Sequence, residues 1–306
     1  MVFTVLESVE GSVRSLESKP APVVTAYASS SPGSQTGSSQ SLIAPYRSAW
    51  INRALITRLT KREIEARYRG TLLGFLWLAL VPIILLGVYA FVFSVVFETK
   101  WAVAIEGRGD FVLLLFTGLI IFNFFAECLN RAPSLVLANV AYVKKVVFPL
   151  EILTWIAVLT ALFNAAISAT VLAIAFVALR GLPPIEVLYL PLILAPIMLF
   201  AIGITHVLSS IGVFVRDLQQ ITGLMTMVLM FMSPLFYPLS ALSPQLQKLM
   251  GLSPIAVTIE QSRAVLFQGL APDLVQLGIM LISSAVVAWL GHLWFIKTKK
   301  GFADVV

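Results

Sequence analysis

Charged residues, cysteines and histidines are all scarce in this sequence. Only 12% of its residues are charged and 59% are hydrophobic, whereas soluble domains contain about 25% charged and about 45–50% apolar residues. A soluble core could not bury so much apolar surface, because cores stop growing near this chain length. The single cysteine, Cys128, excludes an internal disulfide, a thiolate metal cluster and a CxxC redox pair. The composition therefore predicts a membrane protein.

Motifs of catalysis and nucleotide binding are also missing. The sequence has no GxxxxGK[ST], HExxH or GxSxG motif, and we therefore do not expect an enzyme. The two histidines, His206 and His292, lie in apolar runs, where each is either a packed, helix-bonding residue or part of a proton relay. Glu127 and Glu151 are acids close to the cytoplasmic ends of such runs, and Arg131 lies one turn beyond Glu127 as a candidate ion-pair partner. Ion-coupled transport needs ionisable groups near the bilayer midplane, and these two acids lie near the ends of the runs instead. If the chain is a transporter, we therefore expect its energy to come from another subunit.

The sequence is rich in long runs that lack charged residues except at their ends. A membrane-spanning helix needs about 20 apolar residues, so each run can cross once and none can cross twice. We therefore predict an all-α, polytopic membrane protein with six transmembrane helices, at Thr71–Phe97, Phe111–Ala126 (extending past Glu127), Ile152–Leu179, Val187–Val215, Leu218–Gln247 and Leu274–Ile296.

The distribution of basic residues predicts the orientation. Six crossings place both termini on the same side of the membrane. Most of the 21 lysines and arginines fall on that side, and the opposite side holds only Lys100, Arg108, Arg180, Lys248 and Arg263. The positive-inside rule then predicts that both termini are cytoplasmic.

The N-terminal part differs in composition from the rest. Residues 1–45 include a Ser- and Gly-rich stretch, and we predict a disordered extension there, followed by one transmembrane domain at residues 46–306. From Tyr46 to Arg69 apolar residues recur at helical spacing between arginines and lysines. This pattern is typical of an amphipathic helix in the membrane interface, and a solvated charged helix is the alternative.

Two connecting segments carry helical patterns of their own. After Arg131, a short amphipathic helix ends in Lys144-Lys145 before Pro149, which fits either a surface for a soluble partner or a plain interfacial loop. On the outer side, Ser243–Ala271 predicts a helical hairpin, with a mobile loop as the alternative. Its second helix would start with Ser253 as the N-cap and Pro254 at the first position.

Five strings in this sequence, in order, resemble the membrane subunit of ABC-type polysaccharide exporters. The strings are Ala66–Trp77, Asn139–Glu151, Arg216–Gln220, Ser233–Pro238 and Lys299–Val305. That family exports O-antigen, capsule or teichoic-acid chains, and the resemblance covers the chain from about Tyr46 to its end. The sequence departs from the family pattern at Ser253-Pro254, where Asn-Pro is expected, and in its N-terminal extension.

The resemblance implies a permease subunit in the bacterial inner membrane that moves a lipid-linked polysaccharide out of the cytoplasm. Two copies would form the channel, and each would bind a separate ABC ATPase subunit. That ATPase would hold the ATP and Mg²⁺, so we expect no cofactor in this chain, and no nucleic acid as a partner. The expected ATPase-coupling residues are Asn139, Tyr142, Val143, Lys144, Lys145, Arg53 and Arg58.

The resemblance also suggests where the substrate would contact the chain. A substrate on undecaprenyl diphosphate would place its phosphates near Arg67, Arg69 and Arg131, whose alternative role is positive-inside anchoring. Aromatic side chains as a group would form a wall for sugar faces, and the alternative for any single ring is packing against lipid or neighbouring helices. The candidates are Phe122, Phe124, Phe125, Phe231, Phe236 and Tyr237.

Glu260 and Arg263 lie one turn apart in the predicted outer hairpin. We expect them to pair and to act in an outer gate. An ABC permease for drugs or small lipids would have the same architecture and is the main functional alternative. A membrane-bound glycosyl- or acyl-transferase would need a cluster of acids or histidines, which the sequence does not show.

Overall fold

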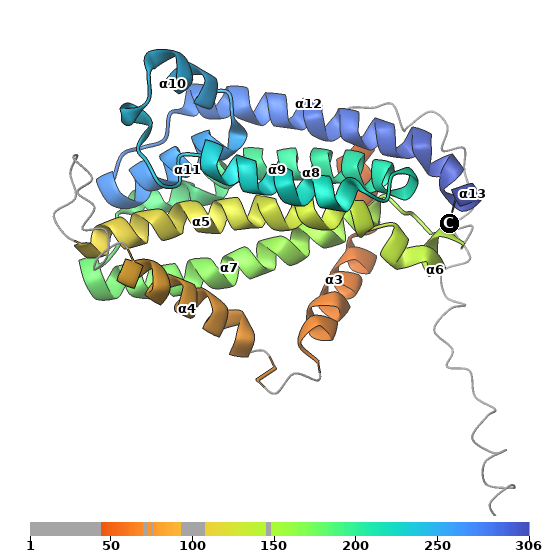
Figure 1. Cartoon of the computed structure of the whole chain (residues 1–306), viewed down its shortest axis with the longest axis horizontal. Coiled ribbons are helices and arrows are strands. Elements are labelled where there is room, and N and C mark those ends of the chain that lie inside the picture. The colour runs from red at the N-terminus through yellow and green to blue at the C-terminus, as the bar shows by residue number, and fades with distance from the viewer. Residues whose placement is uncertain (1–43, 70–72, 75, 93–107, 145–147, 306) are drawn as a thin grey trace, which may run out of the picture. The chain divides into compact units, whose positions relative to one another are not determined.

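All regular elements in the described part of the chain are helices, as the sequence predicts (Figure 1). The computed structural model describes the chain except residues 1–43, 70–72, 75, 93–107, 145–147 and 306. Residues 1–43 of the predicted disordered extension and Lys145 therefore lie outside the described residues.

Within the described residues, four helical segments are long and apolar enough to cross a membrane: Gly109–Ser134, Ile152–Arg180, Ile185–Phe214 and Leu274–Gly301. Their main helices are α5 (Arg108–Arg131), α7 (Ile152–Arg180), α8 (Leu190–Phe214) and α12 (Leu274–Thr298). The other two predicted spans form shorter apolar helices, α4 (Leu76–Phe91) and α9 (Leu218–Met232). The described part of the chain thus contains four candidate spans, and the count of six stays a prediction.

Helix α5 is the central helix of the described part. In the 18-residue apolar stretch of α5, 78% of the residues are buried within the chain. The corresponding shares for α7, α8 and α12 are 11%, 33% and 28%. Phenylalanine and leucine side chains on different faces of α5 are buried, and α5 packs against α7, α8, α9 and α11. The other three long helices therefore present most of their apolar surface outward, as helices bounded by lipid do.

Helices α8 and α12 approach each other closely because both have glycine at their crossing. A Cβ atom added at Gly203 would lie 2.6 Å from the carbonyl oxygen of Val287. One added at Gly291 would lie 2.3 Å from the carbonyl oxygen of Gly203. Any larger side chain would push the two backbones apart, and small residues at such crossings are typical of packed membrane helices.

The amphipathic segment before the first apolar run forms two helices. Helix α2 (Ala44–Ile51) ends before Asn52, whose side-chain amide donates to the carbonyl oxygen of Ser48 at 2.9 Å, and α3 (Arg53–Tyr68) follows. Helix α3 packs on α7, and Ile56 and Thr60 are its buried residues. The predicted amphipathic pattern is therefore present, although the structure divides it at Asn52.

The segment after α5 contains three short helical elements where the sequence predicts one helix. They are η3 (Ala132–Ser134), η4 (Leu137–Asn139) and α6 (Val140–Val143). Element η3 lies tightly against α8, because a Cβ atom at Gly212 would be 2.2 Å from the carbonyl oxygen of Pro133. This segment is therefore attached to the spans at its start.

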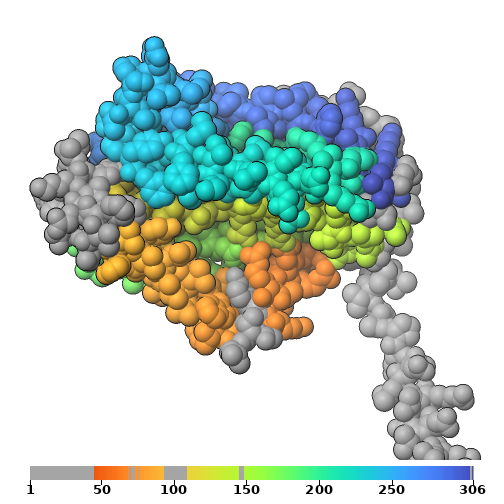
Figure 2. Space-filling model, viewed as in Figure 1, coloured from red at the N-terminus to blue at the C-terminus, as the bar shows by residue number. Residues whose placement is uncertain are grey.

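The segment between α9 and α12 contains two short helices, α10 (Pro244–Met250) and α11 (Pro254–Arg263). The hydroxyl of Ser253 accepts a hydrogen bond from the backbone N–H of Ala256 at 3.4 Å, which confirms the predicted N-cap. Figure 2 shows α9 as a band across the visible face, where Leu224, Met227 and Phe231 are exposed. The remaining elements are η5 (Ile185–Tyr189), η6 (Leu239–Ala241), η7 (Ala264–Gln268), η8 (Lys299–Gly301) and α13 (Phe302–Val305).

Candidate functional site

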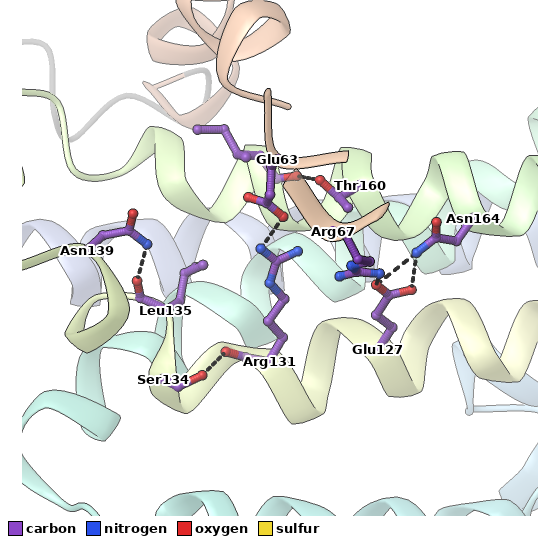
Figure 3. Close-up of polar contacts among 10 residues, drawn as sticks. Glu63, Arg67, Glu127, Arg131, Ser134, Leu135, Asn139, Thr160 and Asn164 are labelled. Atoms are coloured by element: carbon purple, nitrogen blue, oxygen red, sulfur yellow. Dashed lines mark hydrogen bonds and ion pairs between the residues drawn. The ribbon is translucent and has the colours of Figure 1, made fainter. Parts of the chain in front are cut away.

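A cluster of charged and amide side chains joins α3 to α5 and α7 (Figure 3). The Arg67 guanidinium forms an ion pair with Glu127, with Nη1 2.8 Å from Oε1. The side-chain amide of Asn164 donates to both oxygens of the same carboxylate, at 3.0 and 2.9 Å. One carboxylate on α5 therefore connects a cation on α3 with an amide from the middle of α7.

A second ion pair joins the same two helices one turn away. Arg131, at the end of α5, pairs with Glu63 of α3. The expected pair of Glu127 with Arg131 within α5 is therefore wrong. The physical reason is that α3, which packs on α7, brings a residue of opposite charge to each of these two residues of α5, so both pairs form between helices.

Helix α6 is also joined to α3. Nη2 of Arg62 donates a 2.5 Å hydrogen bond to the hydroxyl of Tyr142. The Tyr142 ring stacks on Phe148, with centroids 4.3 Å apart and planes 8° from parallel. A cavity of about 180 Å³ lies between α3, α6 and the start of α7, with Asn139 and Glu63 among its lining residues. The α3 helix is therefore the element that contacts both α6 and the spans.

The structure places the expected coupling residues on α3 and α6. Arg53 and Arg58 are exposed on α3, and Arg53 lies over the Trp50 ring at 4.8 Å. The Asn139 side chain donates to the carbonyl oxygen of Leu135 at 2.9 Å and so helps to close the turn before α6. Lys144, directly after α6, is exposed, and Tyr142 and Val143 are half-buried. These residues thus lie on neighbouring elements, α3 and α6.

A further ion pair joins the start of α7 to the C-terminal segment. Lys299 Nζ lies 2.9 Å from Oε2 of Glu151, and the Ser48 hydroxyl donates to the other oxygen at 3.3 Å. Burial raises the pKa of Glu151, but the charge and hydrogen bond of Lys299 outweigh burial and lower that pKa overall. The carboxylate is therefore ionised at neutral pH and ties α2, α7 and η8 together.

The three arginines expected at a diphosphate differ in their surroundings. Arg67 and Arg131 are paired with Glu127 and Glu63, respectively, and Arg69 is exposed just after α3. The structure therefore gathers the three arginines at one end of α3, and two of them already face carboxylates.

The six aromatic candidates separate into two groups. Phe122, Phe124 and Phe125 are only 2%, 4% and 3% exposed, and they pack inside the bundle around α5. This burial gives them a packing role, since a sugar would have almost no ring surface to contact. Phe231 is 57% exposed, and its ring centroid lies 6.1 Å from that of Phe236.

Tyr237 completes the second group. Its hydroxyl donates to the carbonyl oxygens of Phe231 and Met232, at 3.2 and 3.0 Å. These carbonyls belong to the last turn of α9, where no intrahelical donor is left for them. The three aromatic residues therefore form one group at the end of α9.

The predicted pairing of Glu260 and Arg263 is confirmed, with Nη1 of Arg263 3.2 Å from Oε1 of Glu260. Arg263 is only 4% exposed and also donates to the carbonyl oxygens of Leu114, Pro234 and Leu235, at 3.1, 2.6 and 3.0 Å. Burial lowers the pKa of Arg263 to about 10, so its guanidinium stays charged at neutral pH. Arg263 therefore fastens α11 to α5 and to the chain that follows α9.

The two histidines, which are far apart in the sequence, pack against each other. Their ring centroids lie 5.3 Å apart in an edge-on arrangement, and both side chains are buried between α8 and α12. Nδ1 of His206 is 2.9 Å from the carbonyl oxygen of Ile202, one turn earlier. This arrangement fits packed, helix-bonding histidines.

Sequence reasoning missed Glu63 and Asn164 as members of the polar cluster. One signal for Glu63 was available, because α3 and α5 carry the same Glu-then-Arg pattern, Glu63 and Arg67 on α3 and Glu127 and Arg131 on α5, with the two residues four positions apart on each helix. Asn164 is the only amide in the predicted third span, but its sequence position alone did not show which helix it faces.

Comparison with known proteins identifies related sequences over most of the chain. The family model described as "ABC-2 type transporter" matches residues 54–267. The O-antigen export system permease protein RfbA of Myxococcus xanthus is 27% identical over 267 residues, which are 87% of this chain and 100% of that protein.

More distant relatives carry names of the same kind. A protein of Klebsiella pneumoniae, also named O-antigen export system permease protein RfbA, is 24% identical over 82% of this chain and 95% of its own length. The polysialic acid transport protein KpsM of Escherichia coli is 23% identical over 79% of this chain and 92% of its own length.

Proposed function

Because the chain belongs to the ABC-2 type transporter family, we propose that it is the membrane subunit of an ATP-driven exporter of lipid-linked polysaccharide. The observation that carries this proposal is the match to an O-antigen export permease over that protein's whole length. Two further relatives named for O-antigen export and polysialic acid transport support the same class of cargo.

In this proposal the chain crosses the inner membrane six times, and both termini are cytoplasmic. The four long candidate spans would be joined by α4 and α9 as the remaining two crossings. Tilt and local thinning of the bilayer allow somewhat short apolar helices to span. The end of the bundle that carries Arg67, Arg131 and Lys299 would face the cytoplasm, in accord with the positive-inside rule.

Energy would come from a separate ABC ATPase, which binds the ATP and Mg²⁺. Helix α6 and the exposed arginines of α3, Arg53 and Arg58, offer that subunit a basic surface. The hydrogen bond from Arg62 to Tyr142 links the two parts of this surface. Two copies of the chain would form the channel, each with one ATPase, and the exposed side chains of Leu224 and Met227 on α9 would find partners in the second copy.

The substrate would be a glycan on undecaprenyl diphosphate. Arg67, Arg69 and Arg131 would meet the diphosphate, since the planar guanidinium fork pairs well with phosphate oxygens. Phe231, Phe236 and Tyr237 would offer the sugars an aromatic wall. Glu260 and Arg263 would act in the outer gate by holding α11 against the end of α9.

A deletion strain tests the proposed cargo. Loss of the chain should abolish long surface polysaccharide and leave drug tolerance unchanged. Retained surface polysaccharide together with lowered drug tolerance would contradict the proposal and favour a drug permease of the same architecture.

Co-purification tests the proposed partner. The full chain should retain an ABC ATPase from the same cell, and Val143→Asp in α6 should weaken that retention. Lys248→Glu in α10, at the other end of the bundle, is the matched control and should retain the ATPase as the unaltered chain does. Failure of every candidate ATPase to bind would contradict the proposal.

A further inference from the structure

The two ion pairs between α3 and α5 form a reciprocal ladder. Glu63 and Arg67 lie four residues apart on α3, and Glu127 and Arg131 lie four residues apart on α5. Residues four apart on a helix lie on one face. Each pair joins a carboxylate of one helix to a guanidinium of the other, so the ladder has two rungs of opposite polarity.

Two of the three arginines that the proposed function assigns to the diphosphate, Arg67 and Arg131, are members of this ladder. In the structure, carboxylates occupy the guanidinium faces that a phosphate would use, and the four charges sum to zero. A diphosphate cannot form bidentate pairs with Arg67 and Arg131 while Glu127 and Glu63 hold them. Carboxylate and phosphate are therefore competing ligands for the same two side chains.

The ladder is accessible enough for such an exchange. Its four side chains are between 24% and 37% exposed, and ion pairs of this exposure are weak. Nη1 of Arg131 is itself buried and has no hydrogen-bond partner within the described residues, so a phosphate oxygen that took the place of Glu63 would supply one. Glu127 would stay bonded to the amide of Asn164 after losing Arg67, because Asn164 contacts both of its oxygens.

We propose that Glu63 and Glu127 hold the places of phosphate groups, and that an isoprenyl diphosphate headgroup displaces them from Arg131 and Arg67. This inference rests on the proposed function and deepens it. The displacement breaks both rungs and frees α3 from α5. Because Arg62 of α3 is bonded to Tyr142 of α6, arrival of the lipid headgroup at the membrane changes the surface that the ATPase contacts.

Binding measurements on the purified full chain in lipid nanodiscs test the exchange. The probes are farnesyl diphosphate, inorganic pyrophosphate and farnesol. Glu127→Gln and Glu63→Gln each remove one competing carboxylate, so each should tighten farnesyl diphosphate binding by about fivefold, the value of a weak ion pair. Arg67→Gln and Arg131→Gln should weaken it by a similar factor. Glu65→Gln is the matched control, because it removes the same charge from α3 outside the ladder, and it should change binding less than twofold.

The outcomes separate competition from a general effect of charge. Equal tightening by Glu65→Gln and Glu127→Gln, or no tightening by either ladder variant, would overturn the exchange. Farnesyl diphosphate should bind more tightly than pyrophosphate, and farnesol should not compete. Equal affinity for farnesyl diphosphate and pyrophosphate would assign the site to a soluble polyphosphate and overturn the lipid source.

A distance measurement tests the release of α3. Spin labels at Lys61→Cys on α3 and Asn123→Cys on α5, in a Cys128→Ser chain, should move apart when farnesyl diphosphate is added. An unchanged distance at saturating ligand would overturn the release. If no ATPase co-purifies but the ladder variants change binding as predicted, the proposed function is contradicted and the exchange is not. If an ATPase co-purifies but the ladder variants do not change binding, only the exchange is contradicted.

Discussion

The guanidinium of Arg62 on α3 donates a hydrogen bond to the Tyr142 hydroxyl on α6, 80 residues further along the chain, at 2.5 Å. The Tyr142 ring is held from its other side by the stack with Phe148. Helix α3 in turn is held to α5 and α7 by Arg67, Glu127 and Asn164. A force on α6 can therefore reach two long apolar helices through one short amphipathic helix.

Removing this hydroxyl should uncouple ATP hydrolysis from transport. Tyr142→Phe deletes the hydrogen bond and keeps the ring that stacks on Phe148. The lost bond is exposed, so the expected loss of folding stability is below about 1 kcal/mol. ATPase binding should persist, whereas export per ATP hydrolysed should fall several-fold in reconstituted vesicles.

Tyr189→Phe is the control for the tyrosine substitution, because Tyr189 lies in η5 at the other end of the bundle. It should leave export per ATP unchanged. If Tyr142→Phe exports as much glycan per ATP hydrolysed as the unaltered chain, the hydrogen bond between α3 and α6 does not couple ATP hydrolysis to transport.

Replacing the buried arginine of α11 should destabilise the chain strongly. Arg263→Met keeps an unbranched side chain but leaves the carbonyl oxygens of Leu114, Pro234 and Leu235 without their donor. Loss of a buried, multiply bonded cation costs about 3 kcal/mol or more. Thermal unfolding in detergent should show a clear fall in Tm. Arg58→Met, at an exposed position of α3, should leave Tm nearly unchanged, and an equal fall in both variants would contradict the assignment.

The crossing of α8 and α12 should tolerate no added methyl group. In Gly291→Ala the new Cβ atom would lie 2.3 Å from the backbone of Gly203, so one of the two helices must shift. Overpacking of this kind costs about 1–3 kcal/mol. Gly278→Ala, on the same helix, places its Cβ where no atom lies within 4 Å, and alanine there should be neutral or slightly stabilising. Thermal unfolding of the two variants should therefore differ, and matching Tm values would contradict the close approach.

The contribution of Glu151 to stability should disappear in acid. Its pKa in the folded chain is below the ordinary value of 4.5, because Lys299 outweighs the effect of burial. A carboxyl group with a lowered folded pKa stabilises the fold above its unfolded pKa, and this stabilisation is lost as the pH falls through the folded value. At pH 7 the unaltered chain should be more stable than Glu151→Gln by about 1–2 kcal/mol.

Thermal unfolding of both chains between pH 7 and pH 3 checks the sign. The difference in Tm should be largest near neutral pH and should shrink below pH 4.5. Glu65→Gln, which alters a half-buried glutamate whose Oε1 lies 3.9 Å from Nζ of the exposed Lys61, should show a much smaller change. A difference between Glu151→Gln and the unaltered chain that grows in acid would contradict the assignment.

The sequence predicted the helices better than it predicted their contacts. Long apolar runs identify α5, α7, α8 and α12 because lipid imposes both length and composition on a span. The N-cap at Ser253 and the Glu260–Arg263 pair were predictable because both depend on residues one turn apart.

Contacts between helices could not be predicted from residue spacing along the sequence. The carboxylate of Glu127 was assigned to Arg131 on its own helix, but it binds Arg67 of α3 and Asn164 of α7. Phe122 and Phe125 are candidates for a sugar-contacting wall by sequence but are buried in the structure, since composition does not reveal which face of α5 is enclosed. Such facts depend on how neighbouring helices pack, and many packings satisfy the same apolar pattern.

The most direct test of the central claim is transport in proteoliposomes that contain only this chain, its ABC ATPase and an undecaprenyl diphosphate-linked glycan. The account predicts that ATP added on the ATPase side moves the glycan to the opposite leaflet, and that omitting either this chain or ATP abolishes the movement. Glycan movement that needs no ATP, or ATP-driven movement of a small drug while the glycan stays in place, would contradict it.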